Sequence, residues 1–200
     1  MGMFSKDAVK VIADHRADSI VVSTMTAMFY LHEISPSPLN IDSVPLMGGA
    51  SGLGLGLALS QPDRKVLVLD GDGSLLMQLG SLATIAGAKA KNFFHFVFEN
   101  GVWFEELSNL SIPAEGRLDF KGMAKAAGYA AAYSFKDLEQ LKEGLSSVFN
   151  GPAPAFIHLD INVTNSNRVF SKENIQREIP DFQFMRMGMQ VRKLKEELCK

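Results

Sequence analysis

Short apolar runs alternate along this chain with longer segments of helical periodicity. We predict strands at Ser19–Ser23, Lys65–Asp70, Phe93–Glu99, Ala130–Tyr133 and Ala155–Ile161. We predict helices at Lys6–His15, Gly49–Ser60, Leu75–Ala90, Phe120–Ala127 and Asp137–Phe149. This alternation is typical of β-α-β units, in which parallel strands form one sheet with helices on its faces. We therefore expect an α/β fold with three α/β/α layers around a mainly parallel, five- to six-stranded sheet.

The chain from Thr164 onward has a different character, because strand signals disappear and a charged, helix-like segment follows Pro180. Apolar residues recur in this segment at intervals of three and four, at Phe184, Met187, Val191 and Leu194. One face of such a helix can pack against another surface. We expect residues 1–163 to form one domain and residues 164–200 a C-terminal helical extension. The extension either folds onto its own domain or grips another chain.

Composition narrows the class of protein. The 200 residues are 46% hydrophobic and 21% charged, with a net charge of −2, which fits a folded domain and gives no basic face for nucleic acid. The one cysteine, Cys199, rules out an internal disulfide and a multi-cysteine cluster. The apolar stretch around Leu53–Leu59 is far shorter than the roughly 20 residues that span a bilayer. We expect a cytoplasmic protein with neither a nucleic-acid nor a membrane partner.

The strongest chemical signal is the segment Asp70–Ser74, which follows a buried strand and precedes a helix. Open α/β sheets bind ligands at the carboxyl ends of their strands, and glycines there let the backbone approach an anion such as phosphate. The carboxylate of Asp72 would repel phosphate unless a cation lay between them. Oxygen ligands of this kind suit Mg²⁺. Taken alone, the segment is equally compatible with an ordinary turn.

Two further elements support a ligand site. Asn100 follows the next apolar strand, 28 residues after Asp72, so both side chains can emerge at one edge of the sheet. An amide oxygen is also a suitable ligand for a hard metal. The glycine-rich segment Pro45–Gly56 matches neither the dinucleotide-binding fingerprint nor the phosphate loop of nucleotide-binding proteins. It favours either close backbone approach to a cofactor or tight helix packing.

The sequence Gly71-Asp72-Gly73, followed after about 26 residues by Asn100-Gly101, resembles the metal–diphosphate motif of thiamine diphosphate (TPP) enzymes. The residues around the motif, at 73–84, 46–48 and 54–59, are similar to the diphosphate-binding domain of sulfopyruvate and phosphonopyruvate decarboxylases. The resemblance covers roughly residues 5–160. It implies that TPP and Mg²⁺ are the cofactors and that a small 2-oxo acid is the substrate.

The resemblance also implies roles for individual residues. Asp72 and Asn100 would be side-chain ligands of Mg²⁺, and the main-chain carbonyl of Val102 would be a third ligand. Contacts to the cofactor would come from Pro45, Met47, Gly48, Gly71, Gly73 and Ser74. Met47 matches the bulky residue that lies between the two cofactor rings. Pro45 replaces a glycine whose carbonyl accepts a hydrogen bond from the cofactor, and proline retains that carbonyl.

The segment after Asn100 departs from the pattern of these decarboxylases, because a small, glycine-rich stretch is replaced by Val102–Leu107. Related pyruvate decarboxylases carry a glutamate for proton transfer six residues past the metal-binding asparagine. That position corresponds to Glu106, with Glu105 as the competitor if the loop is one residue shorter. Both carboxylates also fit a solvated helix start. We expect His95 and His158, which lie in apolar strands, to be satisfied core residues.

The resemblance further implies a component that this sequence does not provide. TPP chemistry requires an activating glutamate on a pyrimidine-binding domain, whereas one sheet accounts for residues 6–161 here and leaves only about 40 residues. We expect a separate alpha subunit to supply that domain, in an assembly of at least α₂β₂. Together the two subunits would decarboxylate the 2-oxo acid to an aldehyde.

Other functions remain open at this point. A carboligating transferase of the acetolactate synthase type uses the same cofactor, but such enzymes usually carry all their domains in one long chain. A 2-oxo acid:ferredoxin oxidoreductase subunit would need cluster-binding cysteines, and Cys199 stands alone. A non-catalytic regulatory subunit is the remaining alternative. The intact pair of Asp72 and Asn100 argues against it.

Overall fold

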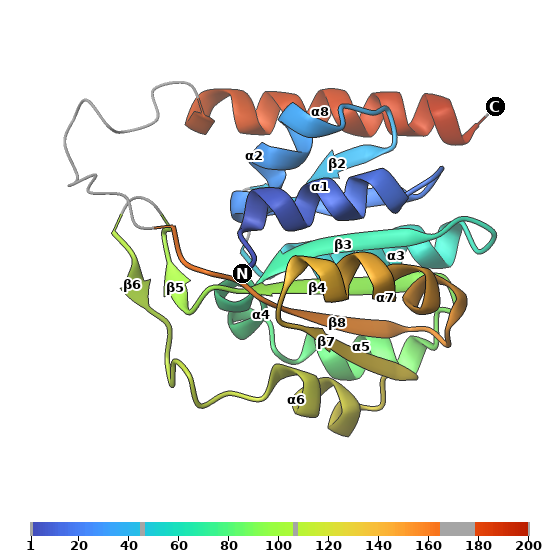
Figure 1. The fold of residues 1–200 in the computed structure, drawn as a ribbon. Coiled ribbons are helices and arrows are strands. Elements are labelled where there is room, and N and C mark those ends of the chain that lie inside the picture. Colours follow the sequence, from blue (N-terminus) through green and yellow to red (C-terminus); the bar gives the residue numbers. More distant parts are fainter. Residues whose placement is uncertain (1, 45–46, 106–107, 165–178, 200) are drawn as a thin grey trace.

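The computed structural model describes residues 2–44, 47–105, 108–164 and 179–199, with a six-stranded sheet at its centre (Figure 1). The strand order is β2-β1-β3-β4-β8-β7, and all neighbouring strands are parallel. The strands are β1 (Ile20–Ser23), β2 (Asn40–Asp42), β3 (Val66–Gly71), β4 (Phe93–Glu99), β7 (Ala131–Phe135) and β8 (Ala155–Asp160). Two short strands, β5 (Val102–Trp103) and β6 (Leu110–Ser111), form an antiparallel pair outside the sheet. The predicted parallel α/β fold is confirmed.

Helices cover both faces of the sheet. They are α1 (Ser5–His15), α2 (Met25–Ile34), α3 (Gly49–Ser60), α4 (Asp72–Met77), α5 (Ser81–Ala88), α6 (Phe120–Ala127), α7 (Leu138–Asn150) and α8 (Ile179–Leu198). Helices α1, α2 and α7 share one hydrophobic cluster with the sheet, and α3, α5 and α6 share the other. Along β3, Val66 and Val68 belong to one cluster while Leu67 and Leu69 belong to the other. Apolar residues on both faces of the central strands therefore produce the three layers.

Several elements differ from the prediction, and helix α2 and strands β5 and β6 are among those outside the predicted set of helices and strands. Strand β2 was not predicted, because its three residues include polar Asn40 and Asp42, although all three are buried. The single helix predicted over Leu75–Ala90 is two helices, since α4 ends where Gln78 adopts a non-helical φ of −136° and α5 begins at Ser81. Helix α4 also begins earlier than predicted, at Asp72. The motif residues therefore form the first turn of a helix that directly continues β3.

The described part of the C-terminal extension lies on its own domain. Helix α8 runs beside α2 and β2 (Figure 1), and Leu194 is buried in the core. Arg186 Nε donates to Asp42 Oδ2 at 2.6 Å, and the backbone N–H of Asp42 donates to Gln190 Oε1 at 2.8 Å. The side chain of Phe184 lies outside the described residues. Among the helices that the structure describes, none is long and apolar enough to cross a membrane.

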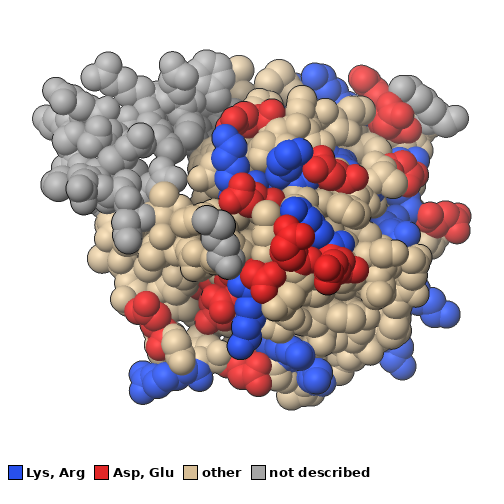
Figure 2. Space-filling model, viewed as in Figure 1, with Lys and Arg blue, Asp and Glu red and all other residues tan. Residues whose placement is uncertain are grey.

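Acidic and basic side chains are interspersed on the face of the molecule shown in Figure 2. Two exposed ion pairs illustrate this mixing, because Lys6 pairs with Glu33 at 2.9 Å and Lys10 pairs with Asp14 at 3.1 Å. The small net charge of −2 follows from nearly equal numbers of the two signs, 20 Lys and Arg against 22 Asp and Glu.

Candidate functional site

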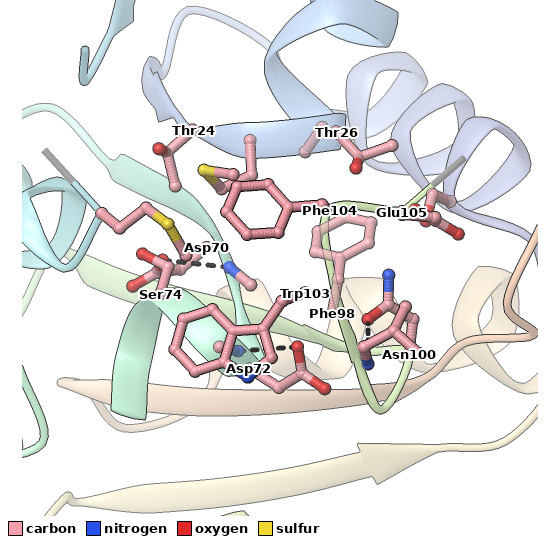
Figure 3. Close-up of a pocket in the computed structure, with 17 residues that line it drawn as sticks. Thr24, Thr26, Asp70, Asp72, Ser74, Phe98, Asn100, Trp103, Phe104 and Glu105 are labelled. Atoms are coloured by element: carbon pink, nitrogen blue, oxygen red, sulfur yellow. Dashed lines mark hydrogen bonds between the residues drawn. The ribbon is translucent and has the colours of Figure 1, made fainter. Parts of the chain in front are cut away.

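A pocket at the carboxyl edge of the sheet brings together most of the residues that the sequence singled out (Figure 3). Strand β3, helix α4, the end of β4 and strand β5 all contribute to it. The predicted residues that line it are Met47, Gly71, Asp72, Gly73, Ser74, Asn100, Val102 and Glu105. No site role was assigned from the sequence to the other lining residues, which are Ser5, Thr24, Met25, Thr26, Ala27, Asp70, Phe98, Trp103 and Phe104. The four from Thr24 to Ala27 lie where β1 passes into α2, and no polar motif marks that junction.

Two predicted site residues, Pro45 and Glu106, lie outside the described residues. Gly48 is described, and its backbone N–H donates to Ser74 Oγ at 2.8 Å. A side chain at position 48 would be strained, because φ is +86° and a Cβ would lie 2.8 Å from the Cβ of Gln78. Gly48 thereby fixes the segment that carries Met47 against helix α4.

Asp72, the acid of the Gly71-Asp72-Gly73 motif, is buried, with only 2% of its surface exposed. Its Oδ1 accepts from the backbone N–H of Gly73 at 2.7 Å, and its Oδ2 accepts from that of Gly101 at 2.8 Å. Burial raises the pKa of Asp72 to about 6; the negative charge of Glu99 adds to the rise, and the backbone hydrogen bonds oppose it. A bound cation would stabilise this desolvated carboxylate in its charged form.

Asn100 lies at the same turn. Its Oδ1 accepts from the backbone N–H of Val102 at 3.1 Å, while Gly101 between them adopts a φ of +74°. No three His, Cys, Asp or Glu side chains converge as a metal cluster in the described part of the chain. A metal held here would therefore rest on one carboxylate, one amide oxygen and main-chain carbonyls, with further positions open to ligand oxygens. That donor set suits Mg²⁺, which commonly keeps water and phosphate ligands.

A buried chain of hydrogen bonds starts at Asp70, next to the motif, and was not predicted. Asp70 Oδ1 accepts from the backbone N–H of Gly71 at 3.0 Å, and Oδ2 lies 3.2 Å from His95 Nε2. His95 Nδ1 in turn lies 3.1 Å from the hydroxyl of Tyr129. Burial and the charge of Asp70 raise the pKa of Tyr129 far above its ordinary value, so its hydroxyl stays protonated and can donate to His95. The predicted role of His95 as a satisfied core residue is correct, and its partner is an acid of the pocket wall.

His158 is mostly buried, with 15% of its side chain exposed, and both of its ring nitrogens have partners, so it lies at the edge of the core. Its Nδ1 lies 2.8 Å from Ser134 Oγ, and its Nε2 lies 2.5 Å from Glu99 Oε2. Glu99 directly precedes Asn100, and its carboxylate is thus held by a side chain of β8.

Glu105 connects the loop after Asn100 to the point where the chain leaves the sheet. Its Oε1 accepts from the backbone N–H of Thr164 at 3.0 Å, and Asn109 Nδ2 donates to the carbonyl of Thr164 at 3.2 Å. Glu105 Oε2 is buried and has no hydrogen-bond partner among the described residues. Glu105 is therefore a pocket residue with one oxygen committed to the backbone, and not part of a solvated helix start.

Trp103 lines the pocket and packs against Gly73 of the motif (Figure 3). A Cβ built on Gly73 would lie 3.2 Å from Trp103 Cε3, so the indole ring lies directly over this glycine. A side chain at position 73 would crowd the indole, which would have to move by a few tenths of an ångström. The indole therefore covers the turn that carries Asp72 at the position of Gly73.

Comparison with known proteins agrees with this geometry. Residues 20–159 match the family model of the thiamine pyrophosphate enzyme, C-terminal TPP binding domain. Because the match spans most of the chain, this chain belongs to the thiamine pyrophosphate enzyme family and contains its C-terminal TPP-binding domain. A crystal structure from Mycobacterium smegmatis, assigned to the thiamin diphosphate-dependent enzymes, shares the fold with a TM-score of 0.69 at 22% identity. It is aligned over 82% of this chain and 32% of its own.

Two curated relatives are more similar in sequence. Phosphonopyruvate decarboxylase of Streptomyces viridochromogenes is 34% identical over 153 residues, which cover 76% of this chain and 38% of that protein. Sulfopyruvate decarboxylase subunit beta of Methanothermobacter thermautotrophicus is 33% identical over 137 residues, which cover 68% of this chain and 70% of that subunit. This chain therefore spans little more than a third of the first relative and most of the second.

Proposed function

We propose that this chain is the beta subunit of a TPP- and Mg²⁺-dependent decarboxylase that acts on a small 2-oxo acid of the sulfopyruvate or phosphonopyruvate type. The observation that carries the proposal is the convergence of Asp72 and Asn100 on the turn at Gly101, at the carboxyl edge of a TPP-binding domain. The similarity to two proteins named as decarboxylases of this type supports the choice of reaction.

The residues present fit a magnesium diphosphate group. Asp72 is a desolvated carboxylate whose pKa of about 6 leaves it largely charged at neutral pH, and each of its oxygens retains a lone pair after accepting one backbone hydrogen bond. Asp72, Asn100 and the main-chain carbonyl of Val102 would hold the metal. When bound, TPP supplies the electron sink that allows a 2-oxo acid to lose carbon dioxide.

The chain's other residues would bind and shield the reactants. Met47 lies on the pocket wall and would contact the cofactor between its two rings. The glycines of the motif would let the backbone approach the diphosphate closely, because they carry no side chain. Trp103 and Phe98 would exclude water from the diphosphate end. Glu106 or Glu105 would transfer a proton. Glu105 is supported by its Oε2, which is buried and has no hydrogen-bond partner among the described residues.

A separate alpha subunit would supply the pyrimidine-binding domain and its activating glutamate, in an assembly of at least α₂β₂. The support is that a relative named as subunit beta matches this chain over 70% of its own length. The substrate pocket would then lie between the two subunits, which agrees with the position of Phe104, 48% exposed beside the pocket.

Product analysis on the co-expressed complex tests the proposed reaction. The complex, supplied with Mg²⁺ and TPP, would be incubated with 3-sulfopyruvate, 3-phosphonopyruvate and pyruvate in turn. We expect carbon dioxide and the matching aldehyde from one of the first two acids. A hydroxyketone product would instead indicate an acetolactate synthase-like transferase. Failure of Mg²⁺ and TPP to bind the complex would indicate a non-catalytic regulatory subunit.

A further inference from the structure

A second cavity lies between helix α8 and the segment that runs from α2 to β2. It has a volume of about 730 Å³, within the roughly 300–1,000 Å³ typical of small-molecule sites. No residue that lines it also lines the pocket at Asp72. This groove is therefore separate from the TPP site, and both the α2-to-β2 segment and helix α8 of the C-terminal extension build it.

The wall of the groove contains an arginine, Arg186, with a buried N–H group that lacks a hydrogen-bond acceptor among the described residues. Arg186 Nε donates to Asp42 Oδ2 at 2.6 Å, while Nη2 is buried and has no acceptor among the described residues. A buried donor without an acceptor loses its hydration without compensation, which is costly for a charged group. An acceptor oxygen from a ligand in the groove would remove this cost.

The groove also has an excess of positive groups. Arg186 and Lys193 are the positively charged side chains among its described lining residues. Asp42 is the one acidic residue among its described lining residues, and both of its oxygens are engaged, Oδ1 by Ser23 Oγ at 3.3 Å and Oδ2 by Arg186. The charge that faces the groove is therefore positive, and a guanidinium with an unused N–H is well suited to a carboxylate or phosphate.

The rest of the lining is largely apolar. Leu31, Pro36 and Pro38 lie on one side, and Met189 lies on the helix α8 side. Met189 is 46% exposed, so it can cover a ligand without leaving the helix. A ligand that fits this surface combines an anionic head with an apolar body.

We propose that this groove binds a small organic anion, a carboxylate or a phosphate monoester with an apolar body, with Arg186 and Lys193 holding its charged end. Arg186 and Gln190 are also the residues that join α8 to Asp42 of β2. Binding would therefore strengthen the attachment of α8 to the sheet. The proposal is independent of the decarboxylase function and requires only the full chain.

Calorimetric titration of the full chain with phenyl phosphate and with benzoate tests this site, with inorganic phosphate as the probe that lacks an apolar body. Both aromatic probes should bind saturably at one site, more tightly than inorganic phosphate, in the presence of saturating Mg²⁺ and TPP. Lys193→Gln should weaken phenyl phosphate roughly two- to fivefold, and Arg186→Gln about tenfold or more. Lys195→Gln is the matched control, because Lys195 is an exposed lysine on the same helix outside the groove.

Three results would overturn the proposal. One is the absence of saturable binding of either aromatic probe at millimolar concentration. The second is an equal loss of affinity in Lys193→Gln and Lys195→Gln, which would indicate a general effect of surface charge. The third is loss of probe binding on addition of a competitor. Competition by Mg²⁺ and TPP would show that the probes bind in the TPP pocket, and competition by the alpha subunit would show that the groove is a subunit interface. Because Lys193 is exposed, Lys193→Gln retains the fold even if Arg186→Gln does not.

Discussion

The carboxylate of Asp72 accepts a hydrogen bond from the backbone N–H of Gly101 at 2.8 Å, which joins the carboxyl ends of neighbouring strands β3 and β4. The same turn holds Asn100, whose Oδ1 accepts from the backbone N–H of Val102. The two side chains that we assign to the metal are therefore fixed by the backbone around them. A site arranged in this way needs little rearrangement when a cation binds.

Replacing Asp72 by its neutral isostere should abolish the metal site. We expect Asp72→Asn to weaken Mg²⁺-dependent binding of TPP to the complex by more than about 100-fold, since loss of a group that merely orients a ligand already costs roughly 10- to 100-fold. Calorimetric titration with TPP at saturating Mg²⁺ measures this. Asp160→Asn, at an exposed carboxylate that ends β8, is the control and should bind TPP like the unmodified chain.

Binding of Mg²⁺ should depend on pH through Asp72. Burial raises the pKa of this carboxyl from 3.8 to about 6, so below pH 6 a proton competes with the metal. We expect the apparent affinity for Mg²⁺ to be constant above about pH 7 and to fall by about tenfold for each pH unit below 6. A flat profile between pH 5 and 7 would contradict the assigned role.

The free energy of unfolding of the metal-free chain should depend on pH in the opposite direction. The folded state binds the proton of Asp72 more tightly than the unfolded state does, so the stability contributed by Asp72 declines as the pH rises from about 4 to 6.

Trp103 should report the binding of the cofactor. It is the one tryptophan of the chain, and its ring packs over Gly73 in the motif. Addition of Mg²⁺ and TPP to the complex should change the intensity or wavelength of tryptophan emission, measured as the difference from a complex that carries Trp103→Phe. Asp72→Asn should remove that difference. An unchanged signal under conditions where calorimetry detects bound TPP would reject the placement of the diphosphate beside Trp103.

His95 should stabilise the fold through Asp70. Because both side chains are fully buried, His95→Leu would leave Oδ2 of Asp70 without its partner, and we expect a loss of about 3–5 kcal/mol in the free energy of unfolding. Urea denaturation measures this loss. The double variant Asp70→Asn/His95→Leu should recover part of it, whereas Tyr129→Phe should cost only about 1 kcal/mol. A loss below 1 kcal/mol in His95→Leu would show that Asp70 does not depend on this contact.

The sequence predicts those features that depend on local pattern and on parallel topology. Strand β4 is apolar on both faces and was predicted with its observed bounds, Phe93–Glu99. The spacing of Asp72 and Asn100 placed them at one sheet edge, because adjacent parallel strands end together. The structure does bring these two residues to a common turn.

Features that depend on packing between distant segments could not be predicted. Glu105 contacts Thr164 across 59 positions, and Arg186 contacts Asp42 across 144 positions. An amphipathic pattern indicates that a helix packs, but it does not indicate on which surface. The two alternatives for the C-terminal extension therefore remained open until α8 was seen beside β2. The hydrogen bonds that link Asp70, His95 and Tyr129 were not predicted for the same reason, since each residue alone resembles an ordinary core or turn residue.

The central claim is that this chain supplies the metal and diphosphate half of a decarboxylase whose other half is a separate subunit. Carbon dioxide release from 3-sulfopyruvate and 3-phosphonopyruvate, measured for each subunit alone and for their mixture, tests it most directly. We predict release only from the mixture, only with both Mg²⁺ and TPP, and none above background when the mixture carries Asp72→Asn. Full release from this chain alone, or an unchanged rate with Asp72→Asn, would contradict the account.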